Sequence, residues 1–529
     1  MLFTILGIIF ATFLFYHYMV KHYNYWKEKG VKQGNPWWIL GDNWGNCFRI
    51  QSFADMIEYV YNQCPGTRYS GMYQFFLPAL LVKDPDLIKQ VTVKDFDHFV
   101  DHRTFVPAEV DPLWGNNLVA LRGQKWREMR TILSPTFTSS KMRAMFVLMA
   151  ECAENWVQYF LDKNEDIVTI EVKDSCTRFA NDVIATTAFG VKVDSMREPK
   201  NEFYLMGKDA TDFVSFFRNL KLLGFIMLPK LFAVLKIKLF SYKVREFFVN
   251  LVSSTIKIRK EQGIVRPDMI NLLLEAQKGN QKQEENDIID TGFATAQESD
   301  LVKTVGKQSR NITDANIVSQ ALVFFFAGFE TISNLMVFLS YELAVNPDIQ
   351  ERLRNEVRET LEECGGKLTY EGLLKMKYMD MVVSEALRKW PNAVATDRVC
   401  TKAYTIQPTM PGEKPLHLEE GAVLFIPIYG IQRDPQHFPD PEHFDPERFS
   451  DENKHNIKPY TYFPFGVGPR NCIGSRFALL EAKSVCFYLL LHFQLVPVEK
   501  TMIPLQISKR SFNLGFDRGL WVGLKRLKH

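Results

Sequence analysis

The feature that most constrains how this chain can fold is a ten-residue loop that places one cysteine between two glycines, directly before a helix. The loop has the pattern F-x-x-G-x-R-x-C-x-G, formed by Phe465, Gly468, Arg470, Cys472 and Gly474. The helix is indicated by apolar residues that recur on one helical face at Ala478, Ala482, Val485, Cys486 and Leu489. Backbone N–H groups and the helix dipole at such an N-terminus favour a thiolate over a thiol. Cys472 is therefore predicted to be a thiolate.

The same loop carries the residue types needed to hold an iron cofactor. A thiolate can ligate iron and push electron density onto it, which favours cleavage of an O–O bond. Arg470 could neutralise a haem propionate, Phe465 could cover the sulfur side of the ring, and the two glycines would let the backbone approach it closely. The alternative is an ordinary glycine-rich turn with a core cysteine. Five fixed positions within ten residues argue against that alternative.

The composition argues against several other classes of protein. The 529-residue chain has 64 Lys and Arg against 61 Asp and Glu, a net charge of +3 that is too balanced to indicate nucleic-acid binding. Its eight cysteines include no CxxC pair, which argues against zinc-ribbon and thioredoxin-like sites. Eight cysteines are also few for a disulfide scaffold of this length, so the other seven are predicted to be small buried hydrophobic residues.

The N-terminal residues 1–20 form an uncharged apolar run, MLFTILGIIFATFLFYHYMV, about long enough to cross a bilayer core as a helix. A cleaved signal peptide is the alternative, but its positive charges usually come first. Here the charges follow the run, at Lys21, Lys27, Lys29 and Lys32. The positive-inside rule then places the body in the cytosol. Because Gly34 and Pro36 indicate a turn, we expect an anchor (1–20), a polar hinge (21–36) and one catalytic body (37–529).

The longest regular element is an apolar helix that Asn311 or Thr313 can cap and that ends at Asn346-Pro347. It is apolar nearly all round, so it is predicted to lie buried across the centre of the body. Its middle contains Ala327-Gly328, although a mid-helix glycine costs about 1 kcal/mol relative to alanine. A flat ligand that approaches the backbone would explain the glycine, and simple helix–helix contact is the alternative.

The rest of the body is predicted to be mainly helical, with short strands near residues 80–82, 423–427 and 520–524. Two stretches differ from it in composition. Residues 220–240 are strongly apolar but hold four lysines and a proline, which favours an interfacial segment with snorkelling lysines over a second membrane span. A pair of core helices is the alternative. Residues 278–310 are polar and predict a long exposed loop.

Taken together, these features resemble the cytochromes P450 over essentially the whole chain. The sequence is most similar to the insect microsomal enzymes of family nine, in the clan that includes the mammalian drug-metabolising family three. The closer resemblance is carried by DHR at 101–103, LSPTFTSSKM at 133–142 and GFATAQES at 292–299. It implies a mainly α cytochrome P450 fold with small β-sheets and an N-terminal transmembrane helix, a haem b cofactor, and haem-thiolate monooxygenase activity.

The resemblance assigns the middle of the long helix to oxygen activation. Ala327, Gly328, Glu330 and Thr331 of AGFET match that motif of the family. Gly328 would leave room for dioxygen over the haem. Thr331 would help to deliver protons, with Glu330 beside it.

Two further motifs imply residues that support the haem. Glu385 and Arg388 match the E-x-x-R motif and lie on one helical face. The family implies that they form a buried structural network with Arg448 of PERF, which fixes the loop leading to the cysteine. Trp126 and Arg130 of WREMR match residues that bond the haem propionates.

One propionate contact of the family is missing from this sequence. Many relatives in the clan have an arginine four residues after the proline that ends the E-x-x-R helix, and here that position is Ala395. Arg398 is nearby but matches a different family position, so His102 or Arg103 is the expected substitute. Val467 replaces the small residue usual in close relatives, and we expect it to be tolerated.

Substrate contacts are implied in five segments of apolar and aromatic character. These are the loop 105–118 with Phe105, the stretch 213–217, the helix positions Phe324, Phe325 and Ala327, the turn 393–396 with Val394 and Ala395, and residues 511–513 with Phe512. Together they predict a roomy pocket for lipophilic small molecules that enter from the membrane. Plant toxins, insecticides, fatty compounds and terpenoids all fit such a pocket.

The implied electron donor is NADPH–cytochrome P450 reductase in the endoplasmic reticulum membrane, with cytochrome b5 as a second candidate, so NADPH would act indirectly. Lys125, Arg127 and Arg476 could form a basic docking face for an acidic reductase, or be scattered solvated charges. Three other functions compete: a P450-fold isomerase or dehydratase, a haem-binding protein without turnover, and a non-haem membrane protein. Glu330 and Thr331, which such isomerases often lack, argue against the first.

Overall fold

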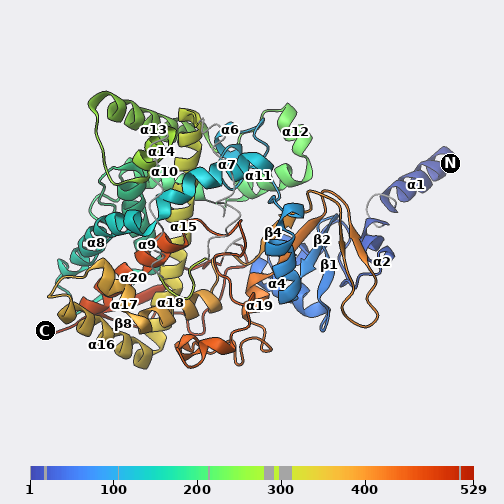
Figure 1. Cartoon of the computed structure of the whole chain (residues 1–529). Coiled ribbons are helices and arrows are strands. Elements are labelled where there is room, and N and C mark those ends of the chain that lie inside the picture. Colours follow the sequence, from blue (N-terminus) through green and yellow to red (C-terminus); the bar gives the residue numbers. More distant parts are fainter. Residues whose placement is uncertain are drawn as a thin grey trace.

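The computed structural model describes residues 2–16, 21–104, 106–212, 215–278, 291–296, 312–510 and 514–528. Most of them form helices; β1, β2 and β4 lie at one side of the body, and β8 lies at the other, near the C-terminus (Figure 1). The described helices are α1 (Leu2–Phe15), α2 (Tyr25–Glu28), α3 (Trp44–Cys47), α4 (Phe53–Gln63), α5 (Pro85–Lys89), α6 (Pro112–Gly115), α7 (Gly123–Leu133), α8 (Ser139–Leu161), α9 (Val172–Ile184), α10 (Glu202–Thr211), α11 (Phe216–Met227), α12 (Pro229–Val234), α13 (Tyr242–Gln262), α14 (Met269–Gln277), α15 (Asp314–Val345), α16 (Pro347–Glu363), α17 (Tyr370–Lys375), α18 (Lys377–Lys389), α19 (Ile428–Gln432) and α20 (Ser475–His492).

The predicted central helix is α15, which runs through the middle of the body (Figure 1). Thr313 caps it: its hydroxyl accepts the Asn316 N–H at 3.2 Å, and the Asn316 side chain accepts the Thr313 N–H at 3.0 Å. The helix ends before Asn346-Pro347, as expected, because Pro347 opens α16. It packs against α9, α13 and α20, and its side chains are buried on most sides. The prediction of a buried central helix is confirmed.

The described strands form three small sheets. They are β1 (Tyr69–Gln74), β2 (Leu77–Val82), β3 (Ile167–Glu171), β4 (Thr396–Val399), β5 (Tyr404–Ile406), β6 (Leu416–Leu418), β7 (Val423–Ile426), β8 (Phe493–Val496) and β9 (Trp521–Arg526). The largest sheet has the order β1-β2-β7-β4, in which β2 and β7 are parallel and Leu80 pairs with Leu424. A second sheet has the order β3-β9-β8, and β5 pairs with β6. All three predicted strand segments are present, as β2, β7 and β9.

The elements that carry the predicted motifs pack together inside one hydrophobic core. α20 lies against α8, α15, α16 and α18, and its apolar residues are buried around most of its circumference. This helix begins three residues after Cys472, so its packing fixes one end of the cysteine loop. α18 lies against both α15 and α20 and carries the E-x-x-R motif. The core therefore holds the cysteine loop and the central helix in fixed relation to each other.

The N-terminal helix α1 projects away from the body (Figure 1). Its 14 described residues would span about 21 Å at 1.5 Å per residue, less than a hydrocarbon core of about 30 Å. Residues 17–20 of the predicted anchor lie outside the described residues. Among the described helices, α15 is the one with the length and apolar composition to cross a membrane, and it is largely buried in the body. The N-terminal anchor therefore stays a prediction.

Candidate active site

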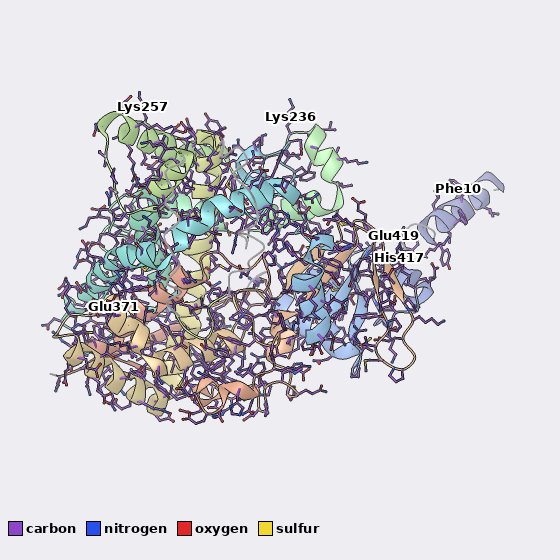
Figure 2. The ribbon with its side chains drawn as sticks, in the orientation of Figure 1. Phe10, Lys236, Lys257, Glu371, His417 and Glu419 are labelled. Carbon is purple, nitrogen blue, oxygen red and sulfur yellow. The ribbon has the colours of Figure 1, made fainter. Side chains whose placement is uncertain are left out.

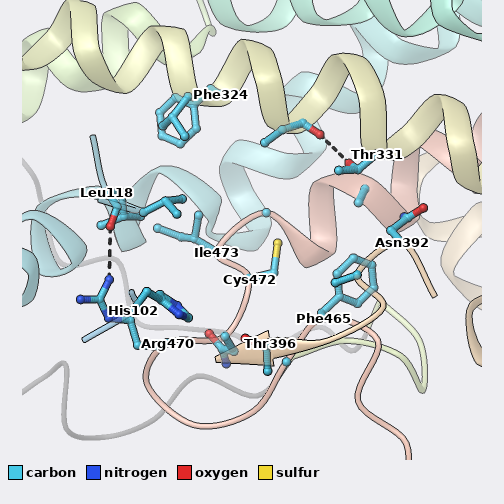
Figure 3. Close-up of a pocket in the computed structure, with 18 of the residues that line it drawn as sticks. His102, Leu118, Phe324, Thr331, Asn392, Thr396, Phe465, Arg470, Cys472 and Ile473 are labelled. Carbon is cyan, nitrogen blue, oxygen red and sulfur yellow. Dashed lines mark hydrogen bonds between the residues drawn. The ribbon is translucent and has the colours of Figure 1, made fainter. Parts of the chain in front are cut away.

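A cavity of about 610 Å³ lies between the middle of α15 and the loop that contains Cys472 (Figure 3). Residues from distant parts of the sequence line it, including Trp126, Ile184, Phe324, Val394 and Cys472. Apolar side chains make up most of the lining, while the charged ones gather at one side. The folding of the chain thus brings the cysteine loop and the central glycine-containing helix, more than 130 residues apart in sequence, to opposite walls of one cavity.

The Cys472 side chain points from its loop into this cavity, toward α15 (Figure 3). The Cys472 N–H donates to the Phe465 carbonyl at 2.8 Å, and the Asn471 N–H donates to the Gly468 carbonyl at 3.0 Å, so the loop is closed on itself. Gly468 has φ +74°, and a Cβ there would lie 2.0 Å from the Thr92 carbonyl oxygen. Gly468 thus approaches the backbone of Thr92, whereas Gly474 of the same motif lines the cavity.

The ionisation state of Cys472 depends on which groups contact its sulfur. Burial raises the pKa of the Cys472 thiol, and the Gly474 N–H and the charge of Arg130 oppose this only in part. The start of α20 therefore does not by itself make a thiolate. A cation in direct contact with the sulfur would do so, since a coordinating thiol is deprotonated outright.

The opposite wall is formed by Ala327, Gly328 and Thr331 of α15. The Thr331 hydroxyl donates to the Ala327 carbonyl at 2.5 Å, one turn earlier (Figure 3). A Cβ at Gly328 would lie 2.8 Å from the Ile184 Cδ1 of α9. Gly328 therefore permits close packing of α9 on α15, which is the helix–helix contact given above as the alternative. It also lines the cavity.

Glu330 does not line the cavity with Thr331. It lies at the interface with α9, where Lys173 Nζ is 3.0 Å from Glu330 Oε1. The same ammonium group donates to Ser333 Oγ at 2.8 Å and to Asn334 Oδ1 at 2.6 Å. Both members of the ion pair are about a quarter exposed, so the carboxylate has access to solvent. Glu330 is thus placed between solvent and the helix turn that carries Thr331.

A cluster of basic side chains forms the polar side of the cavity. Arg130 donates to the Asn471 carbonyl at 2.9 Å and to its side-chain oxygen at 2.6 Å, directly beside the cysteine. The Arg470 guanidinium lies 4.0 Å above the Trp126 ring and donates to the carbonyls of Val100, at 2.7 Å, and Leu121, at 2.8 Å. These two arginines and Trp126 all line the cavity.

Comparison with known proteins identifies this arrangement. The family model described as Cytochrome P450 matches residues 32–516. The chain belongs to the cytochrome P450 family. It is 48% identical to "Cytochrome P450 9e2" of Blattella germanica over 502 residues, 92% of this chain and 91% of the relative. It is also 43% identical to "Probable cytochrome P450 9f2" of Drosophila melanogaster, over 97% of each chain, and 37% identical to "Cytochrome P450 6k1" of Blattella germanica, over 97% of this chain and 95% of the relative.

The family resemblance seen in the sequence is therefore confirmed, including its similarity to insect family nine, and the protein is a P450 monooxygenase. The fold is mainly helical with small sheets, as the family implies. The family also implies a haem held by a cysteine thiolate.

The basic side of the cavity fits the two propionates of a haem. Burial, followed by the charge of Arg398, lowers the pKa of Arg470 to about 9. Burial also lowers the pKa of Arg398 to about 10, and the Arg398 Nε is buried with no hydrogen-bond partner among the described groups. Among the described residues, the carboxylates of Asp101 and Asp397 act on Arg470, and that of Asp397 acts on Arg398. Two further carboxylates would compensate this excess of buried positive charge.

Both expected substitutes for the missing arginine lie at this basic side of the cavity. His102 lines the cavity, and its Nδ1 lies 3.2 Å from Asp397 Oδ1 (Figure 3). Burial lowers the pKa of His102, which favours the neutral imidazole. Arg103 also lines the cavity, where its guanidinium donates to Gln74 at 2.5 Å. Ala395 lines the cavity without a polar group, so His102 and Arg103 both remain candidates for the missing contact.

The predicted supporting network lies behind the cysteine loop. The Arg388 guanidinium makes two hydrogen bonds to Glu385, at 2.7 and 2.8 Å, and both side chains are fully buried. Arg388 also donates to the carbonyls of Gln432, at 3.0 Å, and Pro441, at 2.7 Å. Arg448 joins through an ion pair, with its Nε 3.6 Å from Glu385 Oε1. These contacts bring the three predicted residues together.

Sequence reasoning missed one member of this network, Gln432 at the end of α19. Its side-chain nitrogen donates to the carbonyls of Leu387 and Arg388, each at 3.0 Å, and its side-chain oxygen accepts the Phe463 N–H at 3.1 Å. It thus connects the end of α18 to the segment that leads into Phe465. A single glutamine belongs to no recognisable motif, so its role becomes visible only in the folded structure.

Only some of the predicted substrate contacts line the cavity. Phe324, Val394 and Ala395 line the cavity, as does Phe465 of the cysteine loop. Phe325 does not: it is fully buried among aromatic rings of the surrounding helices, which are Phe189, Phe203 and Phe248. Phe325 is offset from Phe324 by about 100° around α15, which turns its ring toward Phe203 of α10 and Phe248 of α13. Phe105, Phe512 and residues 213–214 lie outside the described residues.

Proposed function

We propose that this P450 inserts one oxygen atom of O2 into lipophilic small molecules, mainly xenobiotics such as plant toxins or insecticides, with electrons from NADPH–cytochrome P450 reductase. The observation that carries the proposal is the apolar cavity with Cys472 on one wall and Ala327, Gly328 and Thr331 on the other. A haem bound between these walls supplies the oxygen chemistry. The chain supplies the sulfur ligand, the anchoring cations, the proton donors and a dry pocket.

Each wall residue has a role in this proposal. Cys472 would supply the sulfur ligand of the iron, and the closed hydrogen bonding of its loop holds Sγ toward α15. Arg130, Arg470 and Trp126 would bind the propionates. The Thr331 hydroxyl donates to the Ala327 carbonyl and keeps its oxygen lone pairs available to accept a proton from the Glu330 side and pass it into the cavity.

The substrate class is inferred from the part of the cavity lining that is neither cysteine loop nor basic cluster. Its members are apolar or aromatic: Phe53, Ile184, Val323, Phe324, Val394, Ala395, Phe425 and Ile428. Pockets of this kind bind small molecules by removing apolar surface from water, and a few polar groups set the orientation. Such a lining favours lipophilic substrates without selecting one chemical skeleton.

Access from a membrane is supported by the surface of α11 and α12. Large apolar side chains are exposed along this pair of helices, namely Phe217, Leu220, Leu228, Leu231, Val234 and Leu235. Lys236, at its end, points outward (Figure 2). Apolar side chains with lysines at the margin are typical of a segment that lies in a bilayer interface. Together with the apolar α1, this surface supports attachment to the endoplasmic reticulum membrane with the body in the cytosol.

Reconstitution tests this proposal. The haem-loaded protein is combined with reductase, lipid and NADPH, and a small lipophilic library is first screened for binding by optical difference spectra. Binders are then followed for NADPH and O2 consumption and for products one oxygen heavier. Conversion without NADPH would instead indicate an isomerase or dehydratase. A haem-loaded protein that accepts electrons but converts no binder would contradict the proposal in favour of a haem-binding protein without turnover.

Replacing Thr331 with alanine is expected to uncouple the reaction. The hydroxyl that donates to Ala327 is lost, while the apolar lining and the cysteine loop are unchanged. Since positioned proton donors contribute roughly 10²–10⁴-fold to rate, we expect product formation to fall about 100-fold while NADPH oxidation continues. Thr331→Ser is the matched control, because it keeps the hydroxyl. Full coupling in Thr331→Ala would require another proton donor.

Reversing the charge of Lys125 tests the predicted docking face. Lys125 is exposed on α7, the helix that carries Trp126 and Arg130, whereas Arg127 already pairs with Asp97 at 2.5 Å and Arg476 is half-buried. Lys125→Glu is expected to slow reduction by the reductase by about tenfold at low ionic strength, and less at high salt. Lys257→Glu, at the outer edge of α13 (Figure 2), is the control. Equal rates at every ionic strength would leave the basic residues as scattered solvated charges.

A further inference from the structure

A six-residue segment of the polar stretch between α14 and α15, residues 291–296, is docked against the body instead of lying in solvent. Thr291 and Ala294 are 1% and 5% exposed. The segment is turned on itself, because the Thr295 N–H donates to the Gly292 carbonyl at 3.0 Å and the hydroxyls of Thr291 and Thr295 are 2.7 Å apart. It contains the first five residues of the GFATAQES motif. The sequence-based expectation of a wholly exposed loop is therefore wrong for this segment.

One side of the segment is bonded to a buried ion pair between α18 and α20. Lys483 Nζ of α20 lies 2.8 Å from Asp380 Oδ1 of α18, and the lysine side chain is almost fully buried. The same ammonium donates to the Thr291 carbonyl at 2.9 Å. The Phe293 N–H donates to Asp380 Oδ2 at 2.9 Å. The segment therefore completes the hydrogen bonding of the charge pair that connects these two helices.

The segment also contacts both ends of the cysteine loop. The Phe293 ring lies 5.5 Å from the ring of Tyr462, three residues before Phe465, and 5.2 Å from that of Phe449 in the PERF motif. The Ala296 N–H donates at 3.3 Å to the hydroxyl of Ser475, the first residue of α20 and three residues after the cysteine. Residues 291–296 are not among the described residues that line the cavity. The segment thus contacts the residues that flank the cysteine loop, Tyr462 before it and Ser475 after it.

We propose that residues 291–296 are a positioning element that holds the Cys472 loop at the start of α20 and so keeps the sulfur in place as a ligand. The proposal rests on the proposed role of Cys472. The segment and the loop that it contacts are far apart in the sequence. Its members act through Ser475, Tyr462 and the Lys483–Asp380 pair, and none of them touches the substrate cavity.

Gly292 offers the sharpest test, since a side chain there has no room. Its φ is +133°, and a Cβ would lie 1.9 Å from Asp380 Oδ1 and 2.9 Å from Lys483 Nζ. Gly292→Ala must therefore displace the segment or separate Asp380 from Lys483. Gly412→Ala is the matched control, because Gly412 also has positive φ, +84°, but nothing lies within 4 Å of where its Cβ would be. Both variants carry backbone strain, and only the first disturbs the docking.

The measurement is the rate at which the reduced carbon monoxide complex loses its red-shifted Soret band at a fixed temperature below global unfolding. We expect Gly292→Ala to lose the band about tenfold faster than wild type, equivalent to about 1.4 kcal/mol, with an unchanged far-UV circular dichroism signal. Gly412→Ala should match wild type. Phe293→Ala should behave like Gly292→Ala, and Phe293→Tyr should restore the wild-type rate, because it keeps the ring against Tyr462 and Phe449.

Two results would overturn the proposal. One is a wild-type rate of band loss in both Gly292→Ala and Phe293→Ala. The other is band loss that occurs only together with loss of the helical signal, which would make the segment a general stabiliser. The experiment separates this inference from the proposed ligand, because a wild-type protein that never shows the red-shifted band contradicts the role of Cys472 itself.

Discussion

A Cys472→Ala variant is expected to lose the red-shifted carbon monoxide band and all monooxygenase turnover. The alanine methyl group cannot ligate iron, and none of the other seven cysteines lines the cavity. His102 is the one imidazole among the described lining residues, and it is hydrogen-bonded to Asp397 on the basic side. No described side chain is therefore placed to take over from the sulfur. The spectrum of the purified, reduced protein and product formation with reductase measure the two losses.

Cys486→Ala is the matched control for this substitution. Cys486 is a buried cysteine on α20, the helix that follows the loop, and burial raises the pKa of its thiol to about 12. It behaves as a small hydrophobic residue, so its loss should lower stability slightly and leave the spectrum unchanged. Retention of turnover in Cys472→Ala, or loss of the band in both variants, would contradict the assignment of the ligand.

Removing the Arg388 side chain is expected to prevent accumulation of the folded, haem-loaded protein. Arg388→Ala removes the two hydrogen bonds that Arg388 makes to the fully buried Glu385 carboxylate, and it removes the guanidinium donor to the carbonyls of Gln432 and Pro441. Breaking a buried ion pair by removing one partner costs about 3–5 kcal/mol, a large part of the stability of a typical fold. The yield of haem-loaded protein and its rate of thermal inactivation measure this loss.

Arg197→Ala provides a comparison with an exposed pair of the same spacing. Arg197 and Asp194 are also three residues apart, with side chains 43% and 38% exposed, and exposed pairs contribute little to stability. We expect wild-type yield from this variant. Normal yield and normal thermal inactivation of Arg388→Ala would show that the network is not required to hold the cysteine loop.

The central features of the fold could be predicted because each depends on local sequence. The cap at Thr313 and the stop at Pro347 define α15, and short continuous apolar runs mark β2 and β7. The pattern around Cys472 places that residue just before α20, where the structure has it. The opposition of Cys472 and Thr331 across one cavity came instead from the family resemblance, since no local rule relates two segments that far apart.

The parts that could not be predicted depend on tertiary contacts. Phe324 and Phe325 have the same chemistry, and only the orientation of α15 against α13 decides that one faces the cavity and the other packs in the core. Gly328 has Ile184 of α9 beside it, a neighbour from another helix. The polar composition of residues 278–310 gives no sign that residues 291–296 dock on the Lys483–Asp380 pair. In each case the deciding partner lies far away in the sequence.

The central claim is that a haem lies between Cys472 and α15, with the sulfur as its thiolate ligand. The most direct test is the carbon monoxide difference spectrum of the purified, haem-loaded and dithionite-reduced wild-type protein. A thiolate ligand predicts a Soret band strongly shifted to the red, present in wild type and absent in Cys472→Ala. A well-folded, haem-loaded wild-type protein without the red-shifted band would contradict the account.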